Sequence, residues 1–536
     1  MQYFIPAWYQ KDDWKEEEQV WYRSRSVTEF DDTVKQVQLF FRKNVAPFKM
    51  LILGFTPNFR HFLHRQGVYH APYWSCFDAM QGIETQDMQV FSFRDLDWPD
   101  GVEFIYSPFA VIVNRNGKKY AQVEFAEDGN MFRVDMFDGE KTCSNIYDDR
   151  GFISCQVVYK KGLPFREQYF DEAGDWRFAR FLEDGHVVIN PEHAWFYGNN
   201  EEKIPYRKER YGSLEEVIEE VLRKHLEDVW QEDIFIAAMD RLHSGILLRA
   251  FSDHKLVLSF FSRRMEEHGI GETDGQLLQY ADYIVADKKE TADRIRKHPE
   301  AEGVKLKVIT PYDSRVEFGI SQQLRVQNIL VAVDGIEDQL FDEMAAALGA
   351  YIQNTNSRAR VCLFTRSAGY SARRILMEKS RRALEKAGLD PELAGDDRGV
   401  SENAIDSVGQ VRAVFSVAQC VDEMSVSRTL REQRLVVDLQ QIPDQFLQIA
   451  AMSMGIPQIT AMETDYMKDG RNGLVVRDIG DLPGALDNYL SSIANYNEAQ
   501  IASYDLGDQF TTDKLVKAWK EVLQSVEDKS TAAGQN

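Results

Sequence analysis

The sequence predicts an α/β protein made of two doubly wound, Rossmann-like domains, the first of which carries an antiparallel β-rich insertion. Three observations lead to this prediction. Strand and helix patterns alternate in the first 80 residues and again after residue 213, short alternating strands fill the stretch between, and a third block of strands and helices begins near residue 328. We expect the first domain at residues 1–325 with its insertion at about 88–205, the second at 326–505, and a C-terminal helix with a disordered tail at 506–536.

The first domain opens with patterns of buried strands and amphipathic helices. Residues 3–5 form a short apolar run, and residues 30–42 are expected to form a helix whose inward side chains are Val34, Val37, Leu39 and Phe40. A second apolar run ends at a glycine, as buried parallel strands often do. After the insertion, an acidic amphipathic helix at 214–229 precedes four more apolar runs, so the parallel sheet resumes there. The runs after the first are residues 49–54, 234–239, 255–260, 283–286 and 305–309.

The predicted insertion consists of short strands that alternate apolar and polar residues. Examples are residues 104–106, 120–125 and 132–137, and the pattern continues through residues 156–159, 168–170 and 176–182. Asn-Gly, Asp-Gly and Ala-Gly pairs separate these strands, and such pairs favour tight hairpin turns. The rhythm predicts an antiparallel meander.

The third block returns to alternating strands and helices. Its strands are expected at residues 329–333, 359–364, 411–417 and 435–439, each a short apolar run with a helical pattern before the next. Strands separated by helices favour a second parallel sheet with helices on both faces.

Composition and targeting signals bound the function. The chain has 536 residues, with 63 Lys and Arg against 86 Asp and Glu, so its formal net charge is −23. This charge disfavours general binding to nucleic acid, because a phosphate backbone would be repelled. The five cysteines include no C-x-x-C pair, which argues against a disulfide scaffold or a cysteine zinc site. The N-terminus lacks the core of a signal peptide, and no apolar stretch reaches the roughly 20 residues that span a bilayer. We expect a cytoplasmic protein, soluble or at most peripheral at the inner face of the cell membrane.

Common catalytic motifs do not occur in the sequence: there is no phosphate-binding P-loop, nucleophile elbow or H-E-x-x-H helix. A D-x-D pattern at residues 95–97 can hold a divalent cation in other proteins, but a solvated turn is the simpler interpretation in so acidic a chain. His61, His64 and His70 lack further zinc-ligand spacing, which favours histidines along a helix. We expect no metal and no cofactor.

One stretch is basic within this acidic chain. Residues 366–386 contain seven Lys and Arg against Glu378 and Glu385. Apolar residues in and directly after this stretch share one helical face, and they are Leu376, Ala383, Leu384 and Ala387. Two interpretations stay open: a packed helix with a solvated basic side, or a contact with an anionic surface, either acidic lipid headgroups or an acidic partner. The candidate contact residues are Arg373, Arg374, Lys379, Arg381, Arg382 and Lys386.

Two phrases near the end of the third block resemble the donor-domain signature of GT-B glycosyltransferases. Residues 450–460 (AAMSMGIPQIT) are similar to E-A-M-A-x-G-x-P-V-I, and residues 469–476 (DGRNGLVV) are similar to D-G-x-N-G-x-L-V. The pattern predicts a helix that ends at Gly455, a strand that begins after Pro457 and a turn at Asn472. The resemblance implies a GT-B-like fold with two facing Rossmann-like domains, the second on the donor side.

The same resemblance marks a donor site that has lost its functional groups. Active members hold the donor sugar and ribose with two carboxylates, at positions that are Ala450 and Ile442 here. They also place cations after the first strand of the donor domain, to neutralise the leaving diphosphate. The corresponding residues 333–339 surround Gly335 with three carboxylates, which would repel a diphosphate by several kcal/mol, by order of magnitude. We therefore predict a degenerate donor site at Ile442, Ala450 and Gly335, with no catalytic residues.

Six further segments are distinctive, and they lie in order along nearly the whole chain at residues 3–9, 21–23, 57–66, 77–78, 149–154 and 168–171. They resemble one family, that of the first protein of the accessory Sec system. The resemblance implies a glycosyltransferase-like but non-catalytic subunit of a Gram-positive export route. That subunit binds a glycosylated serine-rich-repeat adhesin and works with the second and third accessory secretion proteins and the accessory Sec ATPase.

Two further expectations depend on the degenerate site. The alternative function is an active retaining GT-B glycosyltransferase that acts on the adhesin, with Asp444, Glu463 or Asp465 as substitute groups. A sugar-shaped cleft without donor chemistry also suits acceptor binding by aromatic stacking, although core packing is the simpler role for the N-terminal aromatic residues. These aromatic residues are Tyr3, Phe4, Trp8, Tyr9, Trp21 and Tyr22.

Overall fold

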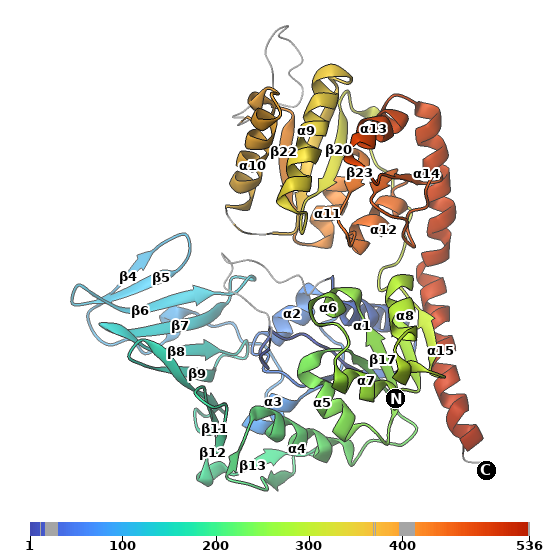
Figure 1. Cartoon of the computed structure of the whole chain (residues 1–536). Helices are drawn as coiled ribbons and strands as arrows, with labels where there is room; N and C mark the ends of the chain where they lie inside the picture. Colours follow the sequence, from blue (N-terminus) through green and yellow to red (C-terminus); the bar gives the residue numbers. More distant parts are fainter. Residues whose placement is uncertain (11, 17–29, 368, 370, 396–412, 534–536) are drawn as a thin grey trace. The chain divides into compact units, whose positions relative to one another are not determined.

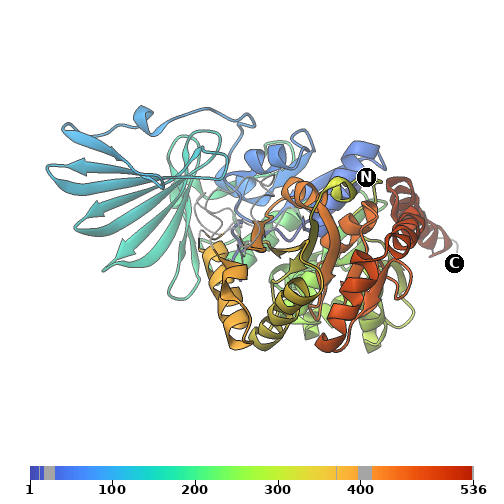
Figure 2. The ribbon, with the colours of Figure 1, turned by 90° about the horizontal axis from the view of Figure 1, so that it is seen from above.

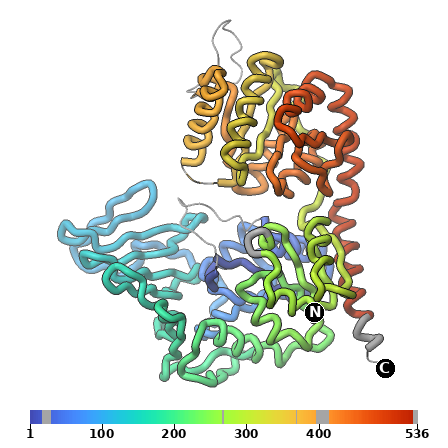
Figure 3. Tube along the Cα trace, viewed as in Figure 1, coloured from blue at the N-terminus to red at the C-terminus, as the bar shows by residue number. Residues whose placement is uncertain are grey.

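A computed structural model describes residues 1–10, 12–16, 30–367, 369, 371–395 and 413–533 (Figures 1 and 3). The chain forms two compact units, each described here by itself. Unit 1 contains Met1–Pro311 together with Ala518–Asn536, and unit 2 contains Tyr312–Lys517. Among the described residues, no helix combines the length and the apolar character needed to cross a membrane.

Unit 1 is built around a seven-stranded parallel sheet of order β19-β18-β17-β16-β1-β2-β3. Its central strands are apolar on both faces because helices cover both sides: Phe4, Leu51, Ile236 and Leu258 are all at most 1% exposed. The predicted N-terminal, 49–54 and post-insertion runs are all strands of this sheet. They are β1 (Gln2–Ile5), β2 (Phe48–Ile52), β3 (Tyr73–Ser75), β16 (Ile234–Ala238), β17 (Lys255–Phe260), β18 (Tyr283–Ala286) and β19 (Lys305–Val308).

The helices of unit 1 begin at local sequence signals. Asp31 caps α1 through the Thr33 amide, and Ser213 caps α4 through the Glu216 amide. Both helices then present apolar residues to the sheet at helical spacing. The helices are α1 (Asp32–Lys43), α2 (Phe59–Arg65), α3 (Cys76–Gln81), α4 (Leu214–Leu226), α5 (Arg241–Ala250), α6 (Ser262–His268), α7 (Glu272–Leu278) and α8 (Lys289–Arg296).

The insertion is an antiparallel sheet of ten strands, which fan outward in Figure 2. The strand order is β15-β12-β11-β10-β9-β8-β7-β6-β5-β4, so β4 to β12 pair consecutively and β15 adds beyond β12. β13 pairs with β14 in a separate hairpin. This arrangement confirms the predicted meander. The strands are β4 (Val102–Tyr106), β5 (Val111–Arg115), β6 (Lys118–Phe125), β7 (Met131–Asp138), β8 (Glu140–Tyr147), β9 (Ile153–Lys160), β10 (Leu163–Phe170), β11 (Trp176–Phe181), β12 (Val187–Ile189), β13 (Trp195–Tyr197), β14 (Lys203–Pro205) and β15 (Arg210–Tyr211).

Unit 2 is a second doubly wound domain, with a six-stranded parallel sheet of order β22-β21-β20-β23-β24-β25. The order reverses between β20 and β23, which is where open α/β sheets bind ligands. The strands are β20 (Gln327–Ala332), β21 (Ala359–Thr365), β22 (Phe415–Gln419), β23 (Gln433–Asp438), β24 (Gln458–Thr460) and β25 (Gly473–Val475). The helices are α9 (Asp338–Asn354), α10 (Ala372–Lys386), α11 (Glu423–Leu430), α12 (Gln445–Ser453), α13 (Leu482–Leu490) and α14 (Ile493–Gly507).

The last helix, α15 (Thr512–Ala533), begins in unit 2 and continues into unit 1. Leu515, Trp519, Val522 and Val526 are buried at helical spacing, and Trp519 packs edge-on against Phe40 of α1. A disordered tail was expected at the end of residues 506–536, whereas the helix continues through Ala533. The polar composition of the last residues concealed that they extend an amphipathic helix.

Candidate functional site

The predicted donor position lies at the carboxyl-end edge of the unit 2 sheet, where the chain leaves β20. Gly335 adopts a left-handed conformation with φ of 72°, which lets the chain turn from the strand toward α9. Asp334 does not point to an open site: its carboxylate accepts hydrogen bonds from Thr365 Oγ1 (2.6 Å) and from the Arg366 backbone amide (2.6 Å). Asp338 pairs with Lys379 of α10 at 2.7 Å. Two of the three carboxylates predicted here are therefore engaged within unit 2.

A buried ion pair lies at the same edge. Arg366 follows β21, and its guanidinium donates to both carboxylate oxygens of Asp444, at 2.6 Å from Nε and 3.0 Å from Nη2. The two side chains are only 10% and 19% exposed. Burial alone would lower the pKa of Arg366, but the charge of Asp444 and its hydrogen bonds outweigh burial and raise that pKa above its usual value. Arg366 belongs to the basic stretch at residues 366–386, but it lies outside α10 and its charge is neutralised by this pair. The pair joins residues 78 positions apart, so sequence reasoning missed it.

The Asp444 carboxylate also begins the helix that carries Ala450. Its Oδ1 accepts from the Leu447 amide at 2.8 Å, which caps α12, so one carboxylate serves both the helix and the ion pair. The Asp444 amide in turn donates to Asp438 Oδ2 at 2.8 Å. Asp438 ends β23 and is completely buried, and burial raises its pKa to about 7. The β23–α12 loop is thus folded back onto its own strand.

The two positions that would carry donor-binding carboxylates offer no polar side chain. Ile442 lies in the β23–α12 loop and is 43% exposed, and Ala450 is half-buried in the second turn of α12. A methyl or butyl side chain forms no hydrogen bond with a sugar hydroxyl. Both residues remain at the carboxyl-end edge that the GT-B resemblance implies, and Gly335 lies on the same edge.

The scaffold of the resembled signature is present around these positions. Gly455 ends α12 with φ of 65°, and a Cβ there would lie 2.6 Å from Gln500 Cγ, so only glycine fits. β24 begins directly after Pro457, as predicted. Asn472 is fully buried and holds the turn before β25 by accepting from the Lys468 amide (2.7 Å) and donating to the Tyr466 carbonyl (2.9 Å).

The substitute carboxylates considered for an active enzyme are held by local contacts. Asp444 is in the ion pair and helix cap described above, and Glu463 accepts a hydrogen bond from the Asp469 amide at 2.9 Å. Asp469 itself accepts from the Val475 amide at 2.8 Å, which closes the loop before β25. These contacts use the carboxylates to shape loops of unit 2.

The basic helix α10 is more neutral than its sequence indicates. Lys379 pairs with Asp338 (2.7 Å) and Lys386 with Asp342 (3.2 Å), both from α9, which lies beside α10 in Figure 1. Arg374 pairs with Glu378 on α10 itself at 2.9 Å. The remaining candidates, Arg373, Arg381 and Arg382, are exposed. The contact with an anionic surface stays a prediction that depends on these three arginines.

The N-terminal aromatic residues pack in the core of unit 1. Phe4 is fully buried against Phe40 and Phe48, and Tyr3 stacks on Phe235. Trp8 and Tyr9 are 7% and 9% exposed. These contacts match the packing role in preference to sugar stacking. Trp21, Tyr22 and Arg23 lie outside the described residues.

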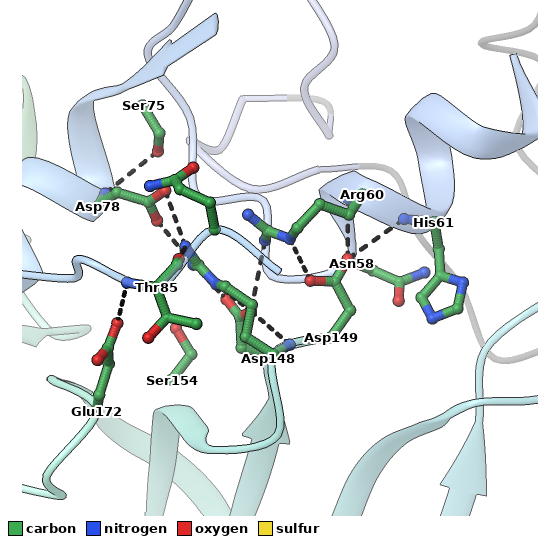
Figure 4. Close-up of polar contacts among 12 residues, drawn as sticks. Asn58, Arg60, His61, Ser75, Asp78, Thr85, Asp148, Asp149, Ser154 and Glu172 are labelled. Carbon is green, nitrogen blue, oxygen red and sulfur yellow. Dashed lines mark hydrogen bonds and ion pairs between the residues drawn. The ribbon is translucent and has the colours of Figure 1, made fainter. Parts of the chain in front are cut away.

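Three segments that carried the family resemblance meet in a buried cluster of unit 1 (Figure 4). Arg150, from the β8–β9 turn, donates to Asp148 (2.7 Å), to Asp78 of α3 (2.8 Å) and to the Thr85 carbonyl (3.0 Å). Asp149 pairs with Arg60 of α2, whose backbone amide also donates to its Oδ2 at 2.8 Å. Both arginines are at most 4% exposed. The cluster therefore joins the meander to the Rossmann-like part of unit 1.

The weak metal motifs have structural roles. In the D-x-D pattern, Asp95 accepts from the Ser92 amide at 2.8 Å and so closes a capping box. His61 and His64 lie on α2, and His70 follows it. Elsewhere in the described chain, Asp171, Asp175 and His193 lie close enough to hold a cation together. Asp171 already faces Arg177 at 3.5 Å, which weakens the case for a metal.

Comparisons with known proteins agree with the family resemblance. A family model described as the first accessory Sec system protein matches residues 1–526. The curated protein of that family from Streptococcus gordonii is 31% identical to this chain, over 98% of this chain and 100% of its own length.

Solved structures extend the comparison to the fold. The chain is similar to one from the Gap123 glycosylation-associated protein complex of Streptococcus agalactiae (28% identity, TM-score 0.80) and to one from the structure of accessory secretory proteins 1, 2 and 3 of Streptococcus pneumoniae (27% identity, TM-score 0.79). Each match covers 98% of this chain and 100% of the other. The pneumococcal O-GlcNAc transferase GtfA, solved with UDP and GlcNAc, shares the fold at 11% identity (TM-score 0.63, 98% of each chain). The fold is therefore GT-B-like, and the chain belongs to the family of the first accessory Sec system protein (accessory secretory protein 1).

Proposed function

We propose that this chain is a non-catalytic, glycosyltransferase-like subunit of the accessory Sec export system, which binds glycosylated serine-rich-repeat adhesin and targets it for secretion. Family membership supports the role in secretion. The observation that carries the non-catalytic part is the Arg366–Asp444 pair at the donor edge, because it neutralises the cation that follows β21.

The electrostatics of the donor edge oppose binding of a nucleotide sugar. A diphosphate leaving group needs cations that are free to turn toward it in the transition state. To bind a phosphate, Arg366 would have to leave Asp444, and the exposed carboxylate would then repel the same phosphate. Ala450 and Ile442 supply no hydrogen bonds in exchange. The site thus keeps the shape of a donor domain without the groups that stabilise charge transfer.

The alternative, an active retaining glycosyltransferase, needs a carboxylate and a cation to reach the donor. Asp444 and Glu463 are engaged with Arg366 and with the Asp469 amide, respectively. An enzyme would have to break these contacts in every catalytic cycle. We therefore prefer a receptor to a catalyst.

We further propose the working partners from the relatives. One of the similar structures contains accessory secretory proteins 1, 2 and 3 by its title, and the other is a Gap123 complex, so we infer assembly with the second and third accessory secretion proteins. The accessory Sec ATPase and the adhesin follow from the family resemblance, as does a cytoplasmic location at the inner face of the membrane.

Two assays on the purified chain test this function. In the first, an immobilised serine-rich-repeat fragment is compared with and without its glycans; we expect binding to the glycosylated form only, and equal binding to both forms would reduce the chain to a scaffold. In the second, the chain is incubated with radiolabelled UDP-GlcNAc and the unmodified fragment. We expect no transfer above the blank, and transfer that depends on protein concentration would establish the enzyme instead.

A further inference from the structure

The meander leaves one long edge open at β4 (Val102–Tyr106). In the described part of the chain, β4 pairs with β5 on one side and has no strand on the other. The opposite edge of the same sheet is β15, which is only two residues long. Proteins usually protect an open edge with a very short strand, a bulge, a proline or a lysine. β4 has no proline, lysine or bulge, its pairing with β5 runs without a register shift, and its one charged side chain is the exposed Glu103.

The backbone of β4 presents a regular set of hydrogen-bonding groups. The Ser107 amide bonds to the Ala110 carbonyl at 3.0 Å, next to the last pair of the β4–β5 ladder. Since amides alternate in direction along an antiparallel strand, the N–H and C=O groups of Val102, Phe104 and Tyr106 point away from β5. A second extended strand could therefore pair with three residues of this edge, as in β-strand addition.

The side chains at this edge are apolar and unusually exposed. Ile105, Tyr106 and Phe109 are 46%, 59% and 49% exposed. Arg94 fixes the Tyr106 ring by donating to its hydroxyl at 2.9 Å, so that ring is held in place before any partner arrives. Ile105 and Tyr106 are consecutive in β4 and so lie on opposite faces of the sheet, and an added strand would meet one exposed apolar side chain on each face.

The charge around the edge selects the kind of strand that fits. Residues 94–103 carry four carboxylates and one arginine, which gives 1 − 4 = −3. A second copy of the chain would bring the same negative segment alongside, and its overall charge of −23 adds to the repulsion. A strand with apolar residues and flanking lysines or arginines has the complementary charge.

We propose that β4 is a docking edge for an extended, apolar segment with basic flanks, supplied by the second or third accessory secretion protein and added to the meander as an eleventh strand. This inference rests on the proposed assembly with those proteins and deepens it by naming the surface. Main-chain hydrogen bonds supply the affinity, while Ile105, Tyr106 and Phe109 select apolar residues on the incoming strand.

Hydrogen–deuterium exchange on the chain alone and in the reconstituted three-protein complex tests the surface. We expect peptides that cover residues 102–106 to exchange roughly tenfold more slowly in the complex, while peptides from β11 (Trp176–Phe181) stay unchanged. A complex that forms without protection of β4 would overturn the docking edge and leave the assembly intact. Failure of the three proteins to associate would overturn the assembly and this edge with it.

Two substitutions and a matched control test the same surface by complex formation, without hydrogen–deuterium exchange. Val102→Pro removes an outward amide at the first residue of an edge strand, where proline is tolerated, and Ile105→Lys places a charge on the exposed edge. Leu163→Lys makes the same change at a 71% exposed position of β10, away from the edge. We expect both edge variants to weaken the complex at least tenfold and the Leu163 control to behave as wild type. Equal complex formation by all four proteins, or a homodimer of the chain that Ile105→Lys abolishes, would contradict the proposal.

Discussion

The substitution Asp444→Asn tests whether the ion pair at the donor edge is structural. Asparagine caps a helix about as well as aspartate, so the amide of Leu447 keeps its acceptor and α12 keeps its start. The lost feature is the charge that faces Arg366 across 2.6 and 3.0 Å. Removing one partner of a buried pair costs about 3–5 kcal/mol. Because the two side chains are still 10% and 19% exposed, we expect the lower end of this range, a decrease of about 3 kcal/mol in the free energy of unfolding of unit 2.

The distribution of tryptophan makes the assay specific to unit 2. None of the nine tryptophans falls within residues 312–517, so tryptophan fluorescence follows unit 1 while far-UV circular dichroism follows both units. In urea, Asp444→Asn should shift the dichroism transition of unit 2 and leave the fluorescence transition in place. Asp444→Ala should cost about 1 kcal/mol more, because it also removes the cap.

A double-mutant cycle with Arg366→Met separates the pair from its surroundings. If the two charges stabilise each other, the double variant Arg366→Met/Asp444→Asn should recover much of the loss, since no unpaired charge then remains buried. A free energy of unfolding for Asp444→Asn within about 0.5 kcal/mol of wild type would refute the reasoning. The donor-edge arginine would then be available to a ligand after all.

Three further predictions follow from buried groups. Burial raises the pKa of Asp438 to about 7, above its value in the unfolded chain, so the folded state binds this proton more tightly. The free energy of unfolding of unit 2 should therefore rise as pH falls from 8 to 5. In urea titrations, Asp438→Asn should flatten that pH dependence. Gly455→Ala should lower the free energy of unfolding by roughly 2–4 kcal/mol, because the new methyl group would clash with Gln500. The control Gly470→Ala should lower it by about 1 kcal/mol, because Gly470 has a similar backbone conformation (φ 66°) with open space around it. Comparable losses for the two variants by circular dichroism would contradict the role of the clash. Arg150→Ala should lower the fluorescence-detected stability of unit 1 by about 3–5 kcal/mol, because the buried Asp148 then keeps only Arg60, at 3.4 Å, to balance its charge. An unchanged midpoint would show that the cluster is dispensable.

Most of the fold was predictable because its sheets are built from clear patterns. Parallel strands such as β20 are apolar on both faces, and the meander strands alternate and end at glycine turns. The ends of individual strands were harder to predict. The strand predicted at 411–417 begins among residues that the structure does not describe, and it corresponds to β22 (Phe415–Gln419). The end of α15 was missed because its last turns are polar, although Trp519 and Val526 are buried at helical spacing before them.

The candidate site was predictable in what it lacks and not in what replaced it. The signature gave the positions of Ala450 and Ile442, since a motif fixes register along the sequence. The Arg366–Asp444 pair depends on β21 and α12 meeting at one sheet edge, and nothing local to either residue indicates it. The charges along α10 also do not predict its ion pairs, because the carboxylates beside Lys379 and Lys386 come from α9.

The most direct measurement is a calorimetric titration of UDP-GlcNAc, with UDP alone in parallel, into the full-length chain. A donor edge whose arginine is already neutralised by Asp444 should give no saturable heat up to millimolar nucleotide sugar. Saturable binding of one molecule per chain at micromolar concentration, competed by UDP and abolished by Arg366→Met, would contradict the view that this family member keeps a glycosyltransferase scaffold without its donor chemistry.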